Sequence, residues 1–208
     1  MKFSFYDREC RALVIGSSGA IGSAIVNNLA KKIPSTNVVT ICRKEDGLDF
    51  MNSDTIALEA EKQVGSFRLI VDATGALEID GVGPEKSFTH LSEDKMLNQF
   101  KVNTIGPALI IKNFMKLLSR SGKVVFVTLS ARVGSISDNR LGGWISYRAS
   151  KTALNQIVKT ASIEAFRKNP DSVFMSVHPG TVKVSLPKIT LVTINLWNQR
   201  RQLIIFFD

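Results

Sequence analysis

The feature that most constrains the fold is a short apolar run that leads directly into a glycine-rich turn and then into a helical pattern. The apolar run covers residues 11–15, the turn covers residues 16–22, and apolar side chains then recur every four positions up to Pro34. This order predicts a buried strand, a tight turn and an amphipathic helix. Glycine lets the backbone approach a phosphate closely, and a helix N-terminus offers free N–H groups and the positive end of its dipole. The pattern therefore favours a dinucleotide-binding turn, with an ordinary Gly/Ser loop as the alternative.

Predicted strands and helices alternate along the rest of the chain. Apolar runs at residues 38–42, 67–73, 123–129 and 172–177 predict further strands. Helical patterns cover residues 53–64, 92–118 and 144–167, with a kink expected at Gly106-Pro107, and residues 43–47 are expected to form a polar turn. The alternation predicts an α/β fold: a Rossmann-type, doubly wound parallel sheet in three layers, forming a single domain over residues 1–208.

Residues that follow the predicted strands should meet at one edge of this sheet, because ligands of such folds lie outside the carboxyl ends of the strands. These residues are Gly16, Arg43, Asp49, Gly75, Ser130 and Pro179.

Tyr147 and Lys151 are four positions apart in the predicted helix 144–167, and residues at this spacing share one helix face. An ammonium group beside a phenol favours the ionised phenol, and so lowers a tyrosine pKa from its ordinary value near 10. A tyrosine tuned in this way can act as a general acid near neutral pH. The alternative is a solvated surface pair of the kind found on many helices.

Composition excludes several classes of protein. With 208 residues and 44% hydrophobic content, the chain fits one ordinary globular domain. Its two cysteines and two histidines lack metal-ligand spacing, so no metal site and no disulfide framework are expected, which favours the cytoplasm. No apolar stretch is long enough to span a membrane or to direct secretion. The net charge of +9 comes from scattered Lys and Arg residues, so nucleic-acid binding is not expected.

The sequence from Ser130 to Lys151, SARVGSISDNRLGGWISYRASK, resembles the short-chain dehydrogenase/reductase family, and most closely its C-factor (C-signal-like) branch. The resemblance covers residues 11–186, and residues 187–208 form an atypical tail. It implies an NAD(P)-dependent oxidoreductase of the carbonyl reductase or alcohol dehydrogenase type. Such an enzyme moves a hydride between nicotinamide and a small carbonyl or alcohol substrate.

The same resemblance implies four catalytic residues, Asn103, Ser130, Tyr147 and Lys151. Tyr147 is expected to give a proton to the substrate carbonyl oxygen, and Ser130 to hydrogen-bond that oxygen. Lys151 is expected to lower the pKa of Tyr147 and to hold the nicotinamide ribose, while Asn103 supports a proton-relay water. Taken singly, Ser130 and Asn103 could instead be ordinary structural hydrogen bonders.

The resemblance also implies a set of cofactor-binding residues. These are Gly16, Ser17, Ser18, Ala20, Ile21, Gly22, Arg43, Asp49, Ala73, Gly75, Tyr147, Lys151, Pro179, Gly180 and Val182. Two departures from the family pattern stand out. Ala20 replaces the middle glycine of the turn, with Gly19 beside it, and Asp72 stands where the family has an asparagine.

The position after the second strand predicts a preference for NADP(H) over NAD(H). An acidic side chain there accepts a hydrogen bond from the ribose 2′-hydroxyl, whereas an arginine binds a 2′-phosphate. Here the acidic position is Cys42 and Arg43 follows it, so a guanidinium is available to the phosphate. The alternative is that Arg43 belongs to a solvated turn.

The C-terminal region looks shortened for the family, although residues 203–207 could supply a closing strand. A second functional class therefore stays open: a C-factor-like dinucleotide-binding signalling or regulatory protein with little or no turnover. The resemblance further implies a homodimer or homotetramer built on the predicted helices 92–118 and 144–167.

Overall fold

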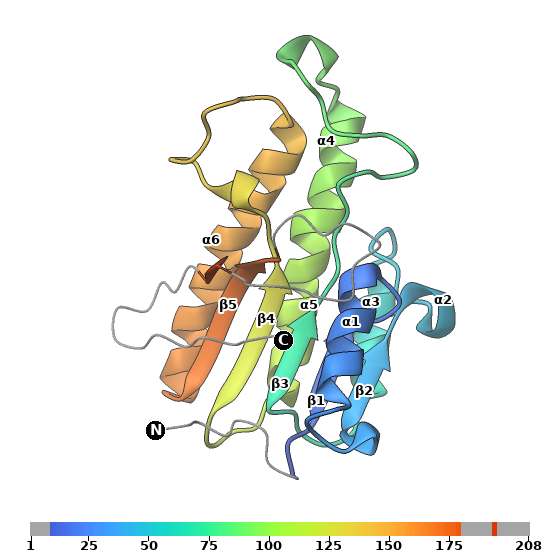
Figure 1. The fold of residues 1–208 in the computed structure, drawn as a ribbon, viewed down its shortest axis with the longest axis vertical. Coiled ribbons are helices and arrows are strands. Elements are labelled where there is room, and N and C mark those ends of the chain that lie inside the picture. The colour runs from blue at the N-terminus through green and yellow to red at the C-terminus, as the bar shows by residue number, and fades with distance from the viewer. Residues whose placement is uncertain (1–8, 180–192, 195–208) are drawn as a thin grey trace.

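Five parallel strands and one short antiparallel strand form the central sheet, in the order β2-β1-β3-β4-β5-β6. The computed structural model describes residues 9–179 and 193–194 (Figure 1). Its strands are β1 (Ala12–Ile15), β2 (Val38–Ile41), β3 (Leu69–Asp72), β4 (Val124–Leu129), β5 (Ser172–His178) and β6 (Thr193–Ile194). The five parallel strands confirm the predicted α/β fold, while the closing strand expected at residues 203–207 lies outside the described residues.

Helices cover both faces of the sheet. The helix α1 (Ala20–Leu29) lies on one face, and α4 (Glu93–Phe100), α5 (Gly106–Phe114) and α6 (Ile145–Lys168) lie on the other (Figure 1). The helix α3 (Asp54–Glu61) packs beside α5. The shorter helical turns are α2 (Arg43–Asp46), η1 (Ser35–Asn37), η2 (Phe88–His90), η3 (Lys101–Ile105), η4 (Met115–Leu117) and η5 (Arg132–Gly134). None of the helices in the described part of the chain is long and apolar enough to cross a membrane.

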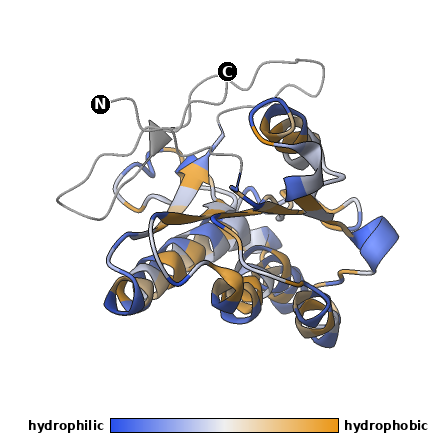
Figure 2. Cartoon of the chain, turned by 90° about the horizontal axis from the view of Figure 1, so that it is seen from below, coloured by the Kyte–Doolittle hydropathy of each residue, from blue (hydrophilic) through white to orange (hydrophobic). Residues whose placement is uncertain are grey.

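Two hydrophobic layers hold these elements together, because alternate residues of a strand point to opposite faces. In β1, Leu13 and Ile15 pack toward α3, α5 and α6, whereas Ala12 and Val14 pack toward α1. All four of these side chains are fully buried. Figure 2 shows the apolar sheet edge-on between the two helical layers. Strands buried on both faces read as continuous apolar runs, which is why the sequence predicted them to within a few residues.

The long helical segment differs from its prediction. A π-helical turn, η3, joins α4 to α5 directly before Gly106-Pro107, where the sequence predicted a kink. The Gly106 N–H donates to the Lys101 carbonyl five residues earlier, and Pro107 has no N–H to donate. The polar turn predicted at residues 43–47 is the short helix α2, which ends at Gly47 with a φ of 77°.

The topology leaves a crevice between neighbouring strands. Because β1 leads into α1 on one face and β3 leads toward α4 and α5 on the other, the chain diverges beyond the carboxyl ends of β1 and β3. The upper ends of α4 and α6 project past the sheet beside this point (Figure 1).

Candidate active site

A cavity of about 340 Å³ lies at the carboxyl edge of the sheet. Its wall is formed by residues 19–21 after β1, residues 73–77 after β3 and residues 129–131 after β4, together with Tyr147, Lys151, His178 and Pro179. Segments that are far apart in the sequence therefore meet where the topology changes direction. Gly16 lies next to this wall, since a Cβ atom on it would be 3.0 Å from the Ala73 carbonyl carbon.

Lys151 is the buried cation of the cavity. Its side chain is only 3% exposed, and its Nζ donates to the Leu129 carbonyl over 3.0 Å. Burial lowers the pKa of Lys151 to about 8, an effect that the buried carboxylate of Asp72 partly opposes. The lysine is therefore close to its titration point near neutral pH.

Tyr147 lines the same cavity one helical turn before Lys151, as the spacing predicted. Its pKa does not follow the expectation, because burial raises the pKa of the phenol above its ordinary value. The Lys151 ammonium lies 6.0 Å from the centre of the tyrosine ring and donates its hydrogen bond elsewhere. In this structure Tyr147 is thus a protonated phenol at neutral pH, and its burial makes it a weaker acid than the predicted lowering of its pKa would.

Ser130 follows β4 and is held by a residue that the sequence analysis did not single out. Its hydroxyl donates to Asn155 Oδ1 over 2.7 Å, and Asn155 Nδ2 donates to the Gly134 carbonyl over 3.4 Å. The signal that could have found Asn155 is its position: it continues the four-residue spacing of Tyr147 and Lys151 along α6.

Asn103 lies in the π-helical turn η3 and ties it to the loop after β3. Its Nδ2 donates to the Ala76 carbonyl over 2.8 Å and to Gln99 Oε1 over 2.7 Å, while its Oδ1 accepts from the Ala76 N–H over 3.0 Å. Gly75 has a φ of 114°, and a Cβ atom there would lie 2.9 Å from both Asn103 Oδ1 and Lys151 Nζ. A glycine is needed at this position because a side chain would collide with both the amide and the ammonium, and because its φ is positive.

Asp72 ends β3 and is fully buried. It accepts hydrogen bonds from the Thr128 hydroxyl over 2.7 Å, from the Thr74 N–H over 3.0 Å and from the Thr74 hydroxyl. Burial raises the pKa of Asp72, although these hydrogen bonds and Lys151 oppose the rise. The Asp72 carboxyl group, which stands where the family has an asparagine, therefore holds Thr74 and Thr128 in place through hydrogen bonds. It also opposes the lowering of the Lys151 pKa.

The glycine turn has the features that a phosphate needs. α1 begins at Ala20 without a side-chain cap and without an acidic residue in its first turn, so its N-terminal N–H groups remain available to an anion. A Cβ atom on Gly22 would lie 2.1 Å from the Gly16 carbonyl oxygen, so the turn packs against the helix as closely as glycine allows. The residues present thus fit a dinucleotide pyrophosphate. Ser17 and Ser18 lie within the same turn.

The remaining predicted cofactor residues lie in different surroundings. Arg43 is exposed at the start of α2, directly after β2. Glu45 and Asp46 offer oxygens within 4.8 Å of the Cys42 sulfur, close to Arg43 in the sequence. Asp49 lines no part of the cavity, and its Oδ1 accepts from the Met51 N–H over 2.9 Å in a local turn.

Two predicted cofactor residues, Gly180 and Val182, lie outside the described residues.

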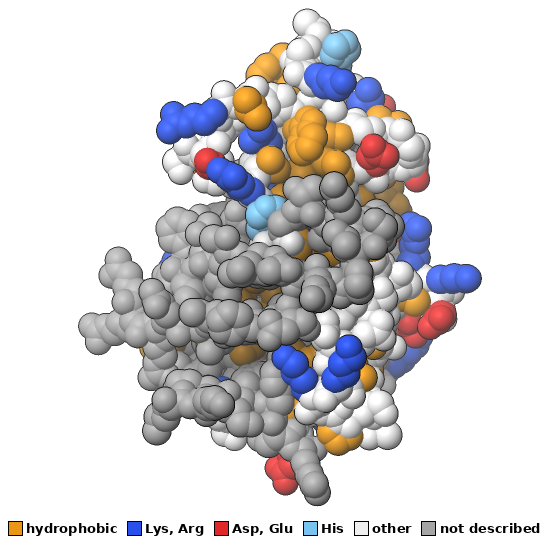
Figure 3. Space-filling view, in the orientation of Figure 1, with side chains coloured by type: hydrophobic (Ala, Val, Ile, Leu, Met, Phe, Trp, Pro, Cys, Tyr) orange, Lys and Arg blue, Asp and Glu red, His pale blue; other side chains and the backbone are white. Residues whose placement is uncertain are grey.

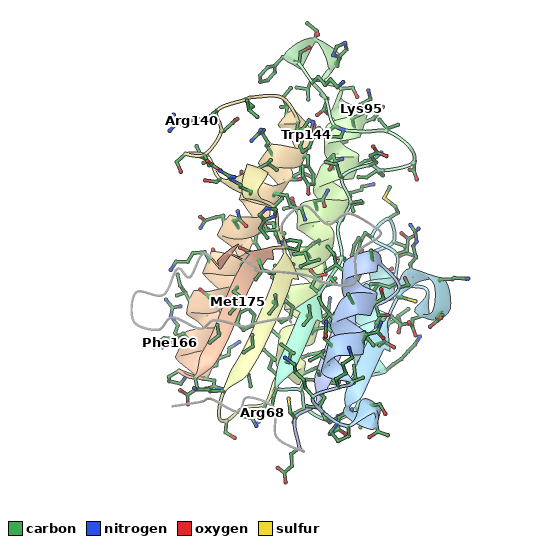
Figure 4. The ribbon with its side chains drawn as sticks, viewed as in Figure 1. Arg68, Lys95, Arg140, Trp144, Phe166 and Met175 are labelled. Carbon is green, nitrogen blue, oxygen red and sulfur yellow. The ribbon has the colours of Figure 1, made fainter. Side chains whose placement is uncertain are left out.

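A carboxylate from the loop after β3 supports the helix that carries Tyr147. Glu85 is buried; its Oε1 accepts from the Ser146 hydroxyl over 2.5 Å, and its Oε2 accepts from the Ser146 N–H over 3.1 Å. Its backbone carbonyl accepts from the N–H of Trp144, which has a left-handed φ of 52°. Trp144 lies near the top of α6, opposite Lys95 on α4 (Figure 4). Glu85 therefore caps α6 from a distant part of the chain.

We expect Glu85→Gln to lower the free energy of unfolding at pH 7 by about 1–3 kcal/mol, because a buried charge-assisted hydrogen bond is weakened. Burial alone would raise the pKa of Glu85, but the hydrogen bonds from Ser146 outweigh it, so the folded pKa lies below its ordinary value. The stabilisation is therefore present above the unfolded pKa and is lost as the pH falls through the folded pKa. Urea denaturation at neutral and acid pH measures this effect. If the difference in the free energy of unfolding between wild type and variant persisted at low pH, the ionised Glu85 would not be its source.

The projecting part of the molecule carries apolar side chains as well as charge. Figure 3 shows hydrophobic, Lys and Arg side chains on its surface, above the atoms drawn in grey. Its loops expose Phe88, Ile136 and Leu141, with Leu141 93% exposed.

The sequence model of short chain dehydrogenases matches residues 49–190, which include Asn103, Ser130, Tyr147 and Lys151. The chain belongs to the short-chain dehydrogenase family. The match spans more than half of the chain, and it includes most of the segments that form the cavity.

The chain is also similar to individual proteins and solved structures. The chain is 30% identical to the 1-hydroxy-2-glutathionyl-2-methyl-3-butene dehydrogenase of Rhodococcus sp., over 85% of this chain and 79% of that protein. It is also 30% identical to the C-signal protein of Myxococcus xanthus, over 46% of this chain and 58% of that protein. Among solved structures, the NADPH-bound carbonyl reductase from chicken fatty liver aligns with a TM-score of 0.67 at 20% identity, covering 86% of this chain and 82% of that chain. That structural likeness concerns the fold.

Proposed function

We propose that this short-chain dehydrogenase is an NADP(H)-dependent oxidoreductase that reduces a small carbonyl compound, or oxidises the matching alcohol, with Tyr147 as general acid or base. The observation that carries the proposal is the meeting of Tyr147, Lys151 and Ser130 in one cavity with the glycine turn after β1. A carbonyl reductase among the structural neighbours and a dehydrogenase of a hydroxyl compound among the relatives support the same reaction class.

Four residues of the chain have separate roles in this proposed reaction. A bound reduced nicotinamide supplies the hydride. The phenol of Tyr147 is protonated at neutral pH, and it gives its proton to the carbonyl oxygen as negative charge develops there. Ser130 offers a second hydrogen-bonding group to that oxygen, and Lys151 places a positive charge beside both. Asn103 fixes the loop of residues 75–77 that forms the opposite wall.

The proposal is tested by following NADPH oxidation with a panel of aldehydes, ketones and quinones. We expect at least one class of carbonyl compound to be reduced by the wild-type chain. Binding of NADPH without turnover of any compound would instead favour the second candidate, a dinucleotide-binding signalling protein, for which the similarity to C-signal is the supporting observation.

For the cofactor, we propose that Arg43 recognises the 2′-phosphate of NADP(H). We expect Arg43→Ala to raise the Kd of NADPH by about tenfold to a hundredfold, the value of a hydrogen bond between charged groups. The Kd of NADH should stay unchanged, because NADH lacks the phosphate. Lys44→Ala, which removes the neighbouring exposed cation of α2, is the matched control with a smaller expected effect. Equal losses for NADPH and NADH, measured by fluorescence titration, would reject Arg43 as the phosphate ligand.

We also propose that the chain forms a homodimer or homotetramer through its long helices. Large apolar side chains on α4, η3 and α6 are about half exposed in the single chain: Leu97, Ile105, Ile163 and Phe166. Burying such side chains in a twofold interface is favourable because apolar surface leaves water. Sedimentation equilibrium measures the oligomeric state, and a monomer at micromolar concentration would contradict this part of the proposal.

A further inference from the structure

Asn155 is the one polar side chain, among the described residues, to which the Ser130 hydroxyl is hydrogen-bonded. The Ser130 side chain is only 9% exposed, and the residue lines the cavity at the end of β4. Its Oγ lies 2.7 Å from Asn155 Oδ1, a short and well-formed hydrogen bond for this pair of groups. The position of the Ser130 oxygen in the cavity wall therefore depends on Asn155.

The orientation of the Asn155 amide is itself determined by its surroundings. Asn155 Nδ2 donates to the Gly134 carbonyl, which also accepts from the Thr152 hydroxyl over 3.0 Å. Turning the amide over would point Oδ1 at a carbonyl oxygen and lose that bond, so Oδ1 faces Ser130. Gly134 makes this approach possible, since a Cβ atom there would lie 3.0 Å from Asn155 Nδ2.

The hydrogen bond to Asn155 determines which hydrogen bonds the Ser130 hydroxyl can make before a substrate binds. A serine hydroxyl has one proton to donate and two lone pairs. With the proton directed to Asn155, the oxygen is left as an acceptor, and it is kept in a single rotamer against the cavity. A carbonyl oxygen that gains negative charge competes for the same proton more strongly than a neutral carbonyl does.

We propose that Asn155 is a positioning residue that holds the Ser130 hydroxyl in its working rotamer until the hydroxyl turns its hydrogen bond from Asn155 to the reacting oxygen, as negative charge develops there and Tyr147 supplies the proton. The proposal rests on the proposed function, because it concerns the serine that faces the carbonyl. Tyr147, Lys151 and Asn155 then form one stripe of α6, in which successive turns supply the proton donor, the cation and the support for Ser130.

The test compares Asn155→Leu, which has a similar side-chain volume but cannot accept a hydrogen bond from Ser130, with the wild-type chain. We expect kcat for carbonyl reduction to fall by about five- to tenfold, because the hydrogen bond that fixes the Ser130 rotamer is lost. The KM of the carbonyl should not rise, because the Ser130 proton is then free to meet the neutral substrate. The Kd of NADPH should be unchanged, which also shows that the variant is folded. Asn155→Ala is made alongside as a second variant that lacks the acceptor.

Two controls separate positioning from a structural effect. Thr152→Val removes another hydrogen bond to the Gly134 carbonyl without touching Ser130, and should leave kcat unchanged. In a Ser130→Ala background, Asn155→Leu should cause no further fall in kcat, because the hydroxyl that it positions is absent.

The outcomes are distinct. An active wild type with unchanged kcat in both Asn155 variants, or a further fall in the Ser130→Ala background, overturns the positioning role and leaves the proposed function standing. A wild type that reduces no carbonyl overturns the proposed function and the positioning role together.

Discussion

Replacing Tyr147 with phenylalanine is expected to lower kcat for carbonyl reduction by about 10²- to 10⁴-fold, the usual contribution of a general acid. The substitution removes a single oxygen atom and keeps the ring, which packs at an angle against Trp144 with ring centres 6.2 Å apart. The loss should therefore come from proton transfer and not from packing. Burial raises the pKa of Tyr147, so the phenol remains an acid throughout the neutral range and its removal should be felt at every pH in that range.

The measurement is steady-state NADPH oxidation with the best carbonyl substrate, together with NADPH titration of both proteins. The Kd of NADPH should differ little, because the glycine turn and Arg43 are untouched. Activity of the Tyr147→Phe protein close to that of wild type would remove Tyr147 from the mechanism, even if the cavity binds the cofactor as proposed.

The second large effect is expected from Gly22→Ala, in the first turn of α1. Its new methyl group would lie 2.1 Å from the Gly16 carbonyl oxygen and 3.0 Å from the Ser17 Cα atom, so backbone has to move. We expect a loss of about 3 kcal/mol in the free energy of unfolding, at the upper end of the usual cost of overpacking. For a domain of this size, that corresponds to a fall in Tm of about 6–12 °C. Because we propose that the same turn binds the pyrophosphate, we expect NADPH affinity to fall as well.

Gly19→Ala is the matched control within the same turn. A Cβ atom on Gly19 would lie 3.4 Å from the Gly16 carbonyl oxygen, an ordinary contact, and its φ of −72° suits alanine. The control should keep its Tm. Equal thermal melts for Gly22→Ala and Gly19→Ala would show that the turn does not need glycine at residue 22.

The fold was predictable largely because the central strands β1, β3 and β4 are buried on both faces. Continuous apolar runs such as β1 and β4 are typical of strands in a parallel sheet, and Pro34 and Gly47 mark the ends of neighbouring elements. The π-helical turn η3 was not predictable in the same way. Glycine followed by proline signals that regular hydrogen bonding is interrupted, but tertiary contacts of Asn103 decide how the interruption is absorbed.

The sequence predicted which side chains meet at the cavity, Tyr147, Lys151, Ser130 and Gly75 among them, better than it predicted their pKa values. Spacing alone placed Tyr147 and Lys151 on one face of α6, and strand ends placed Ser130 and Gly75 beside them. The direction of the Tyr147 pKa could not be predicted, because it depends on how deeply the phenol and the lysine are buried.

The supporting contacts of Glu85 and Asn155 could not be predicted either, since their partners lie 61 and 25 residues away in the sequence.

The central claim is that a hydride passes from a reduced nicotinamide to a carbonyl carbon in the cavity that Tyr147, Ser130 and Lys151 line. The most direct test uses NADPH that carries deuterium at the transferable C4 position, with the alcohol product analysed by mass spectrometry and NMR. The account predicts deuterium on the carbinol carbon with wild type and almost none with Tyr147→Phe over the same time. Wild-type protein that binds this NADPH and transfers deuterium to no carbonyl compound would contradict it.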